Sequence, residues 1–442
     1  MPTASRHQAA SDSSSGSAGF AAWQGLYQTR NCFVHVATGA LVGDRPQISA
    51  ALTEVVMLPK SEKACFVIAD VSGYTKFLVS SELEHAQDII VDFMDTVVEA
   101  LRPTFRLAKF EGDAAFLYAV GNNLDGSLLE DTIETAYFKF RRRKRDVRQS
   151  SACKCKACAS MGDLDLKFVI HHGEMVKQSM GGREELAGRD VILVHRLLKN
   201  IVNERFGRHA YALYSDACIR AMDADPTARG LSEHSETIDI IGDVRAWYRD
   251  LEAAWQKEEE RRHRIVERKD AYIIWDFDIP APRQIVWEYA TVPGQWLQWW
   301  FAENIVEESE NGRRGIGTKN HCTHGGGTVI EEILDWNPID YFTIGITLPT
   351  PNAPQIIMTR TVTEGTAGGS VLEMRVAKPE PEHKEFVDKA AEKFGANMVA
   401  CIERFQNTVK DQLVSLAMIE EPPLRPNQAR FLSKPTQSDS PE

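Results

Sequence analysis

The sequence predicts an α+β fold divided over two domains, and three observations support this. Residues 62–251 alternate between apolar strand-like runs and amphipathic helical patterns. Residues 270–418 contain several further strand-like segments and end in one long amphipathic helix. Between them, residues 252–269 are mostly charged helix formers, which predicts a semi-rigid helical linker. Mixed strands and helices in this order are typical of sheets covered by helices.

In the first domain, Cys65–Ala69 is a run of Phe, Val and Ile that predicts a buried strand, and apolar residues at helical spacing predict a helix over Phe77–Leu101. A Glu-Gly-Asp turn between two apolar segments predicts a hairpin. The segments on either side of this turn are Leu107–Phe110 and Ala114–Val120. The elements expected after the hairpin are a helix, a strand and a helix, over Leu128–Arg143, Leu166–Ile170 and Val191–Arg205.

The second domain is expected to begin with a strand over Ala271–Phe277 and a helix near Arg283–Tyr289. A Trp-rich stretch and further strands follow through Val376. A helix from about His383 to Leu416 closes the domain, because its apolar residues recur mostly every three or four positions.

The two ends of the chain are less informative. Residues 1–20 have the composition of a disordered segment, and residues 21–61 form an extension of uncertain character, with the globular part expected to start near Met57. Residues 419–442 are rich in Pro and Ser, which predicts a disordered tail.

Composition limits the classes of function. The 442 residues carry a net charge of −12 with a pI of about 5.6, which argues against general nucleic-acid binding. The sequence lacks an apolar stretch near the roughly 20 residues that a membrane span needs, and its first residues lack the apolar core of a secretory signal. Eight cysteines in a chain this large argue against a disulfide scaffold, so we expect a reducing, cytoplasmic location.

Two aspartates are the most informative residues of the first domain. Asp70 lies in CFVIADVSGYTKF and Asp113 in KFEGDAAFLYA, each at or near the end of an apolar strand-like run and close to a glycine. Two carboxylates held in this way could bind Mg²⁺ or Mn²⁺ against a nucleoside triphosphate, because hard cations prefer oxygen ligands.

These segments resemble the metal-binding motifs of class III nucleotidyl cyclases, and the resemblance covers most of residues 62–250. It implies a ferredoxin-like α/β sandwich that acts as a homodimer on ATP or GTP, with Asp70 and Asp113 as the metal ligands. LKFVIHHG, which ends at Gly173, is similar to the central strand of that family. Lys109 and Glu185 match the positions that read the base, and Arg196 matches the arginine that stabilises the transition state.

One position departs from the cyclase pattern. Ile192 falls where the family carries an asparagine, one helical turn before Arg196. An isoleucine has no polar group to stabilise a developing oxyanion, and loss of one such contact typically costs on the order of 10²–10³ in rate. The metal half of the site therefore matches the family, whereas the transition-state half does not. His171 and His172 are interpreted as structural strand residues.

Cys153, Cys155 and Cys158 form a C-x-C-x-x-C pattern and are a candidate zinc site. Structural zinc normally takes four ligands, so a fourth would come from His171, His172, Cys218 or a dimer partner. The alternatives are three reduced surface thiols or a redox-sensitive loop.

Residues 270–418 resemble the START-like, polyketide cyclase-like (SRPBCC) superfamily. The resemblance rests on Ile279–Pro282 before a helix, on the segment Lys319–Gly327, on Trp336 and on the closing helix. It implies a helix-grip fold around a cavity that binds a lipid or another hydrophobic molecule. Trp296, Trp299 and Trp300 could line the mouth of such a cavity, although core positions fit them better. The remaining polar residues of interest are His321, Cys322 and His324, which favour a cavity lining over a metal site.

Three hypotheses follow. The first is a nucleotidyl cyclase-like signalling protein that is regulated by a hydrophobic ligand in the second domain. The second is a catalytically inactive cyclase-like receptor, which Ile192 motivates. The third is a lipid or small-hydrophobe binding protein that acts through its START-like domain.

Overall fold

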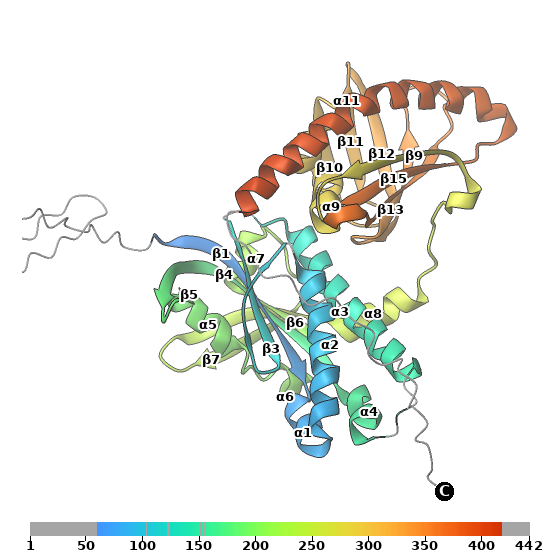
Figure 1. The fold of residues 1–442 in the computed structure, drawn as a ribbon. Coiled ribbons are helices and arrows are strands. Elements are labelled where there is room, and N and C mark those ends of the chain that lie inside the picture. The colour runs from blue at the N-terminus through green and yellow to red at the C-terminus, as the bar shows by residue number, and fades with distance from the viewer. Residues whose placement is uncertain (1–59, 103, 122–123, 151–152, 154, 418–442) are drawn as a thin grey trace, which may run out of the picture. The chain divides into compact units, whose positions relative to one another are not determined.

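The computed structural model describes residues 60–417, apart from 103, 122–123, 151–152 and 154. The expected N-terminal segments 1–20 and 21–61 lie almost wholly outside this range, as does the tail 419–442. The described residues hold two β-sheets, each with its own helices (Figure 1). The predicted α+β class, with a strand-and-helix sandwich followed by a helix-grip domain, is confirmed.

The first domain is built on an eight-stranded sheet in the order β2-β3-β1-β4-β6-β8-β7, with β5 paired to β4. Its strands are β1 (Glu62–Ser72), β2 (Arg106–Glu111), β3 (Ala114–Val120), β4 (Asp165–Met180), β5 (Arg183–Ala187), β6 (Tyr211–Ser215), β7 (Ser232–Ile238) and β8 (Gly242–Asp250). Its helices are α1 (Tyr74–Ser80), α2 (Leu83–Leu101), α3 (Gly126–Ser150), α4 (Lys156–Ser160), α5 (Arg189–Leu197), α6 (Val202–Phe206), α7 (Asp216–Ala221) and α8 (Leu251–Glu260).

Strand β1 lies at the centre of this sheet, between β3 and β4, and is buried on both faces. Because side chains alternate along a strand, Cys65, Val67 and Ala69 pack with α2 and α3 on one face. Phe66 and Ile68 pack with α5 on the other face. The sheet is therefore covered by helices on both sides, and the continuous apolar run that predicts β1 reflects this double burial.

Two predicted helices are each divided in the structure. The helix expected over Phe77–Leu101 is interrupted at Ser81, which has an extended backbone between α1 and α2. The helix expected over Val191–Arg205 is interrupted before α6. There the Asn200 side chain donates to the Leu197 carbonyl and accepts from the Val202 amide, so one residue ends a helix and begins the next.

The expected linker 252–269 is α-helical only in its first half, and a short 3-10 helix over Arg268–Asp270 ends it. Helix α8 ends at Glu260, and residues 261–267 have no regular secondary structure. They are nevertheless held in place, since Arg261 donates to the Trp336 carbonyl at 2.6 Å and the Val266 amide donates to Thr359 Oγ1 at 2.9 Å. The connection is therefore packed against the second domain.

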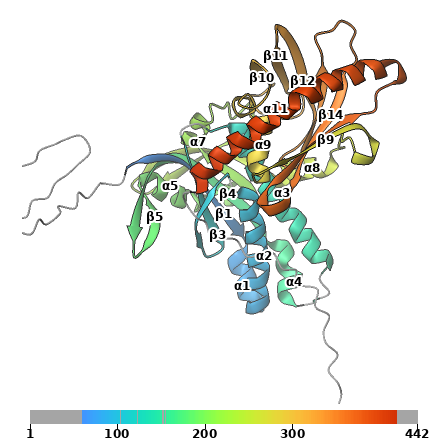
Figure 2. The same ribbon diagram turned by 45° about the horizontal axis from the view of Figure 1, so that its top comes forward.

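The second domain is a seven-stranded antiparallel sheet in the order β10-β11-β12-β13-β14-β15-β9. Its strands are β9 (Ala271–Ile279), β10 (Asn304–Glu308), β11 (Lys319–His324), β12 (Gly327–Asn337), β13 (Tyr341–Thr347), β14 (Ile356–Glu364) and β15 (Ser370–Ala377). Its helices are α9 (Arg283–Thr291), α10 (Pro293–Trp296) and α11 (Lys384–Ala417). Figures 1 and 2 show α11 lying across the strands, and its apolar face joins the core through residues such as Met398 and Phe405.

A buried ion-pair network joins α3 to the connection between β10 and β11. Arg313 from this connection lies 2.7 Å from a carboxylate oxygen of Glu134 and 2.9 Å from one of Asp131. Asp131 also accepts from the indole N–H of Trp336 in β12 at 2.9 Å. Although burial opposes ionisation, the charges of Arg313 and Arg249 hold the pKa of Glu134 below its usual value. We call these residues the α3 network.

None of the helices in the described residues is long and apolar enough to cross a membrane.

Candidate functional site

The two aspartates of the metal hypothesis lie close together at the end of the central strand. Asp70 belongs to β1 and pairs in register with Ala114 of β3. Asp113 directly precedes Ala114, in the turn between β2 and β3. Gly112 allows this turn because its φ of 69° lies in the left-handed region that glycine adopts without strain. The hairpin thus carries the Asp113 carboxylate toward Asp70.

The electrostatics of this aspartate pair are asymmetric. Burial, together with the negative charge of Asp70, raises the pKa of Asp113 to about 6. Lys167 of β4 lies 3.1 Å from Asp70 Oδ2 and supplies one positive charge. The donor set therefore suits a hard divalent cation, because a cation would relieve the repulsion that the two carboxylates exert on each other.

Lys109 and Glu185, the two residues matched to base reading, contact each other. Lys109 of β2 donates to Glu185 of β5 at 3.3 Å and lies 3.2 Å from Glu111. Partial burial opposes the charge of Lys109, but these two carboxylates raise its pKa. Both side chains remain partly accessible, so a ligand could compete for them.

Helix α5 presents the two residues matched to the transition state. It begins after Gly188, whose φ of 147° lies outside the range that other residues readily adopt. The Ile192 side chain is 57% exposed and Arg196 is also exposed. Among the described residues, neither a hydrogen bond nor an ion pair links Arg196, Lys109 or Glu185 to the aspartate pair. One chain thus carries two separate groups of the residues that the resemblance assigns to a single site.

The two histidines at the end of the expected central strand have structural partners. His171 Nδ1 lies 2.7 Å from Ser215 Oγ, and its Nε2 lies 3.5 Å from Asp190. His172 Nε2 lies 3.2 Å from the Gly121 carbonyl oxygen. Burial lowers the pKa of His171, although Asp190 opposes this. These contacts agree with the interpretation of both residues as structural.

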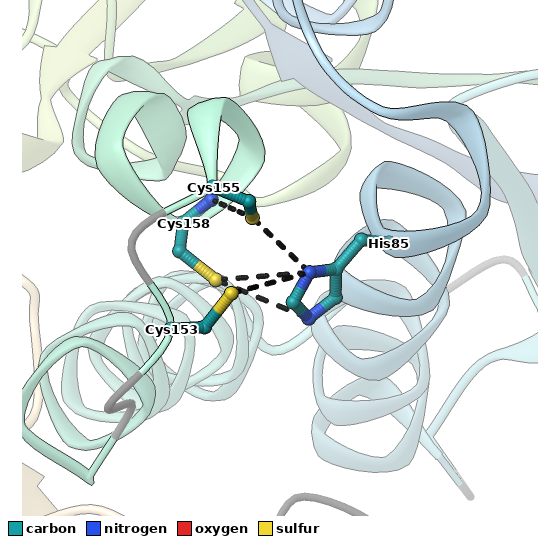
Figure 3. Close-up of side chains that lie close together, drawn as sticks. All are labelled: His85, Cys153, Cys155 and Cys158. Carbon is teal, nitrogen blue, oxygen red and sulfur yellow. Dashed lines mark hydrogen bonds between the residues drawn. The ribbon is translucent and has the colours of Figure 1, made fainter.

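The three clustered cysteines meet a histidine that the sequence analysis did not name. His85, in the first turn of α2, lies against Cys153, Cys155 and Cys158, with the four ligand atoms all within 4.8 Å of one another (Figure 3). The three candidates from this chain for a fourth group, His171, His172 and Cys218, do not belong to this cluster. His171 and His172 have the partners given above, and the Cys218 thiol is buried beside Met222.

The second domain contains a cavity of about 600 Å³ between the sheet and α11. Most of its lining is apolar or aromatic. The apolar and aromatic lining residues are Trp275, Trp300, Phe301, Val329, Ile346, Leu348, Pro349, Ile356, Met358, Val376, Val387, Ala390, Ala391 and Phe394. The polar lining includes Glu331, which is buried and pairs with Arg360 at 3.0 Å.

The tryptophans and the strand β11 residues divide between core and cavity. Trp296, Trp299 and Trp300 are all buried, and of the three Trp300 lines the cavity. In β11, Cys322 is a core residue, whereas His324 lines the cavity. His321 instead faces Glu308, at 3.0 Å. Because side chains alternate along a strand, Cys322 and His324 share the inner face of β11, whereas His321 lies on the opposite face.

Three residues of the candidate sites were not predicted from the sequence. Lys167 and Arg360 each pair with a carboxylate from a distant segment, and single-sequence spacing carries no signal for such contacts. His85 precedes Cys153 by 68 residues, which is outside any local zinc motif. A search for every histidine on a helix before the cysteines could have proposed it as one of several candidates.

Comparisons with known proteins match the two domains separately. Residues 90–205 match a family described as a protein of unknown function (DUF2652). Residues 276–410 match the family described as polyketide cyclase/dehydrase and lipid transport. An uncharacterised protein of Mycobacterium tuberculosis is 41% identical over 113 residues, which are 26% of this chain and 52% of that protein. The match thus spans about half the length of this curated relative.

Solved structures resemble each domain. The adenylyl cyclase CyaB from P. aeruginosa has 16% identity and a TM-score of 0.32, with 43% of this chain and 95% of that chain covered. A protein from Mesorhizobium loti has 16% identity and a TM-score of 0.26, with 31% of this chain and 97% of that chain covered. At such identities and scores these likenesses carry no functional argument. The two family models therefore match different parts of the fold, one within the first domain and one within the second.

Proposed function

We propose that the protein binds a small hydrophobic molecule in the cavity of its START-like domain. The observation that carries this proposal is the cavity itself, which is about 600 Å³ in volume and lined mostly by apolar and aromatic side chains. Its volume lies within the range of about 300–1,000 Å³ that is typical of small-molecule sites. The match of residues 276–410 to a family that includes lipid transport supports the same conclusion.

The polar atoms around the cavity favour a ligand that has one polar end. The ring nitrogens Nε1 of Trp300 and Nδ1 of His324 are buried without a hydrogen-bond partner among the described residues, and both residues line the cavity. A buried polar group without a partner is costly. A carbonyl or carboxylate on the ligand would accept from these groups, while its apolar body would contact Phe301, Met358 and Phe394.

Two alanines of α11 offer a matched test. Ala391 lines the cavity, whereas Ala400, nine positions later on the same helix, is exposed. Ala391→Trp should fill part of the cavity and weaken binding of the fluorescent fatty acid cis-parinaric acid about tenfold or more. Ala400→Trp should leave the affinity within about twofold. The measurement is a fluorescence titration of the full-length protein.

Equal binding by wild type and Ala391→Trp would place the dye elsewhere and contradict the proposal. Circular dichroism and thermal unfolding of both variants control for misfolding. If both variants unfold early, Val329→Phe offers a second change to the cavity, since Val329 also lines it.

We further infer a second binding activity, for a nucleoside triphosphate with a divalent cation. The observation that favours it is the aspartate pair, in which repulsion by Asp70 contributes to the raised pKa of Asp113. Mg²⁺ or Mn²⁺ bound by Asp70 and Asp113 would supply charge neutralisation for the phosphates. Asp70 would exchange its contact with Lys167 for the cation, which leaves the lysine ammonium free to contact phosphate oxygens.

Formation of cyclic AMP or cyclic GMP would require two chains under this proposal. Lys109 and Glu185 contact each other and share no contact with the aspartate pair in one chain. A head-to-tail homodimer would bring these residues and Arg196 of one copy to the aspartates of the other. The exposed Ile192 supports slow turnover or binding alone, because it offers no polar group to the ribose.

Isothermal titration of the purified protein with a slowly hydrolysed ATP or GTP analogue and Mn²⁺ tests the second activity. Asp70→Ala and Asp113→Ala should each abolish metal-dependent binding and any cyclic nucleotide detected by mass spectrometry. Asp276→Ala is the matched control, because Asp276 is exposed and lies on β9 of the other domain. Unchanged binding by Asp113→Ala would remove this proposed site.

A further inference from the structure

Three cysteine sulfurs and one histidine converge on a single point between α2 and α4. His85 Nδ1 and Cys155 Sγ lie 3.1 Å apart. Cys153 Sγ and Cys158 Sγ each lie 3.9 Å from the same nitrogen (Figure 3). The residues come from two segments that are separated by about 70 positions in the sequence.

The imidazole of His85 lies close to all three sulfurs. The Nδ1 atom of an imidazole carries either one hydrogen or one lone pair, so it can make one good hydrogen bond. Cys155 Sγ lies at hydrogen-bond distance from it, and Cys158 Sγ also lies 3.9 Å from the other ring nitrogen, Nε2. A metal ion among the four ligand atoms would bind each of them directly.

We propose that His85, Cys153, Cys155 and Cys158 bind one Zn²⁺ ion in a closed structural site. Three sulfurs and one imidazole nitrogen form a Cys₃His set, one of the usual sets for structural zinc. Bond lengths of about 2.3 Å to sulfur and about 2.0 Å to nitrogen put tetrahedral ligand atoms about 3.5–3.8 Å apart. The distances to His85, from 3.1 to 3.9 Å, bracket this range.

The backbone around Cys155 holds its sulfur in place. The amide N–H of Cys158 donates to Cys155 Sγ at 3.3 Å. Burial of Cys158 and partial burial of Cys155 restrict access by solvent. A closed site with four protein ligands leaves no position for a substrate, so the ion would act on stability and not on chemistry.

The site would tie α4 to the beginning of α2. The two segments already meet here, because Glu82 accepts from the Ala157 amide at 3.2 Å. Helix α1, which directly precedes α2, follows the strand that carries Asp70. Zinc would therefore fix the corner of the first domain that carries the exposed Cys153.

The test measures metal in the purified full-length protein by inductively coupled plasma mass spectrometry. We expect about one zinc per chain, with Cys155→Ser losing nearly all of it. Cys401→Ser is the matched control, since Cys401 is a free cysteine of the second domain, and it should retain the zinc. Thermal unfolding with and without a chelator should show a lower midpoint for the metal-free wild type.

A ligand exchange keeps the proposal testable if Cys155→Ser does not fold. Replacement of zinc by Co²⁺ in the wild type should give an intense visible spectrum with sulfur-to-metal charge transfer. His85→Cys keeps four ligands, and its cobalt bands should shift to lower energy, whereas His383→Cys should leave them unchanged. The proposal is overturned by a protein that takes up no zinc, by iron as the bound metal, by a disulfide among the three cysteines of the freshly purified protein, or by zinc that survives Cys155→Ser.

Discussion

Asp113 shows how a single residue combines local structure with electrostatics. Its position in a tight turn follows from the Glu-Gly-Asp sequence, and the sheet then brings it beside Asp70. Burial and the charge of Asp70 raise its pKa to about 6. A carboxyl with a raised pKa binds protons more tightly in the folded than in the unfolded state, so metal-free stability falls as the pH rises from about 4 through about 6.

Asp113→Asn should therefore stabilise the metal-free protein at pH 7.5, where the native carboxyl is charged and repelled by Asp70. We expect a rise of about 2 °C in the melting temperature, and a smaller rise at pH 4.5, where Asp113 is largely protonated. Calorimetry in the presence of a chelator measures this. An equal effect at both pH values would contradict the electrostatic explanation.

Metal binding should show the opposite dependence on pH. A divalent cation competes with the proton on Asp113, so the affinity for Mn²⁺ should weaken as the pH falls through about 6. Titration of the protein with Mn²⁺, followed by electron paramagnetic resonance between pH 5 and pH 8, measures it. An affinity that does not change over this range would exclude Asp113 as a ligand.

Replacement of Ile192 tests whether the first domain is a damaged catalytic site. It is exposed on α5, so replacement by asparagine should cost little stability. If the site is a damaged cyclase, Ile192→Asn should raise cyclic nucleotide formation by about 10²-fold. Ile201→Asn, another exposed isoleucine of the first domain, is the control. Unchanged activity with intact nucleotide binding would instead favour a receptor.

At the scale of elements, the glycine at the end of the His-His-Gly sequence positions α5. A Cβ atom at Gly173 would lie 2.4 Å from the Asp190 side chain. Asp190 accepts from the Glu174 amide at 2.7 Å and lies in the first turn of α5. The glycine thus leaves room for the contact that attaches the helix to β4, and the helix carries Ile192 and Arg196.

Gly173→Ala should destabilise the protein by about 1–3 kcal/mol, because an added methyl group in a packed region forces a shift. Gly162→Ala is the matched control, since a Cβ atom there meets nothing within 4 Å, and its effect should stay within about 0.5 kcal/mol. Urea unfolding measures both. Equal stability of the two variants would show that α5 moves without cost.

Helices and strands were predictable from the sequence where a local residue pattern determines them. The hairpin around Gly112 and the long helix α11 follow from turn chemistry and helical spacing. The hairpin of β4 and β5 was missed, although Gly181 and Gly182, with φ of 59° and 78°, form a two-residue turn of a recognisable kind. The break at Asn200 was missed because apolar spacing continues on both sides of it, and the interrupting contacts come from one side chain.

At the scale of the whole molecule, the α3 network joins the two domains. Arg313 contacts three carboxylates of α3, and removal of its charge would leave them buried with too few partners. Arg313→Ala should lower the free energy of unfolding by about 3 kcal/mol and speed proteolysis between residues 261 and 270. Arg245→Ala, which breaks an exposed pair with Glu233, should change it by less than about 0.5 kcal/mol. Similar effects of both variants would contradict a structural role for the network.

The sequence predicted the content of each domain better than the contacts between distant segments. Asp70, Asp113, Lys109 and Glu185 could be proposed as site residues because each lies in a local motif. His85 and Arg313 were not, because their partners are set by the packing of helices that no spacing rule relates. The cavity was expected from a resemblance, but its unpaired ring nitrogens are a property of the folded chain alone.

Native mass spectrometry of the full-length protein after gentle purification tests most directly whether the cavity of the second domain holds a hydrophobic molecule. We predict an additional mass of a few hundred daltons, within the range of drug-sized or lipid ligands that a cavity of about 600 Å³ encloses. The additional mass should disappear in Ala391→Trp and persist in Ala400→Trp. A protein that carries no such mass, and that gains none when it is incubated with fatty acids, would contradict the proposal that the cavity binds a hydrophobic molecule.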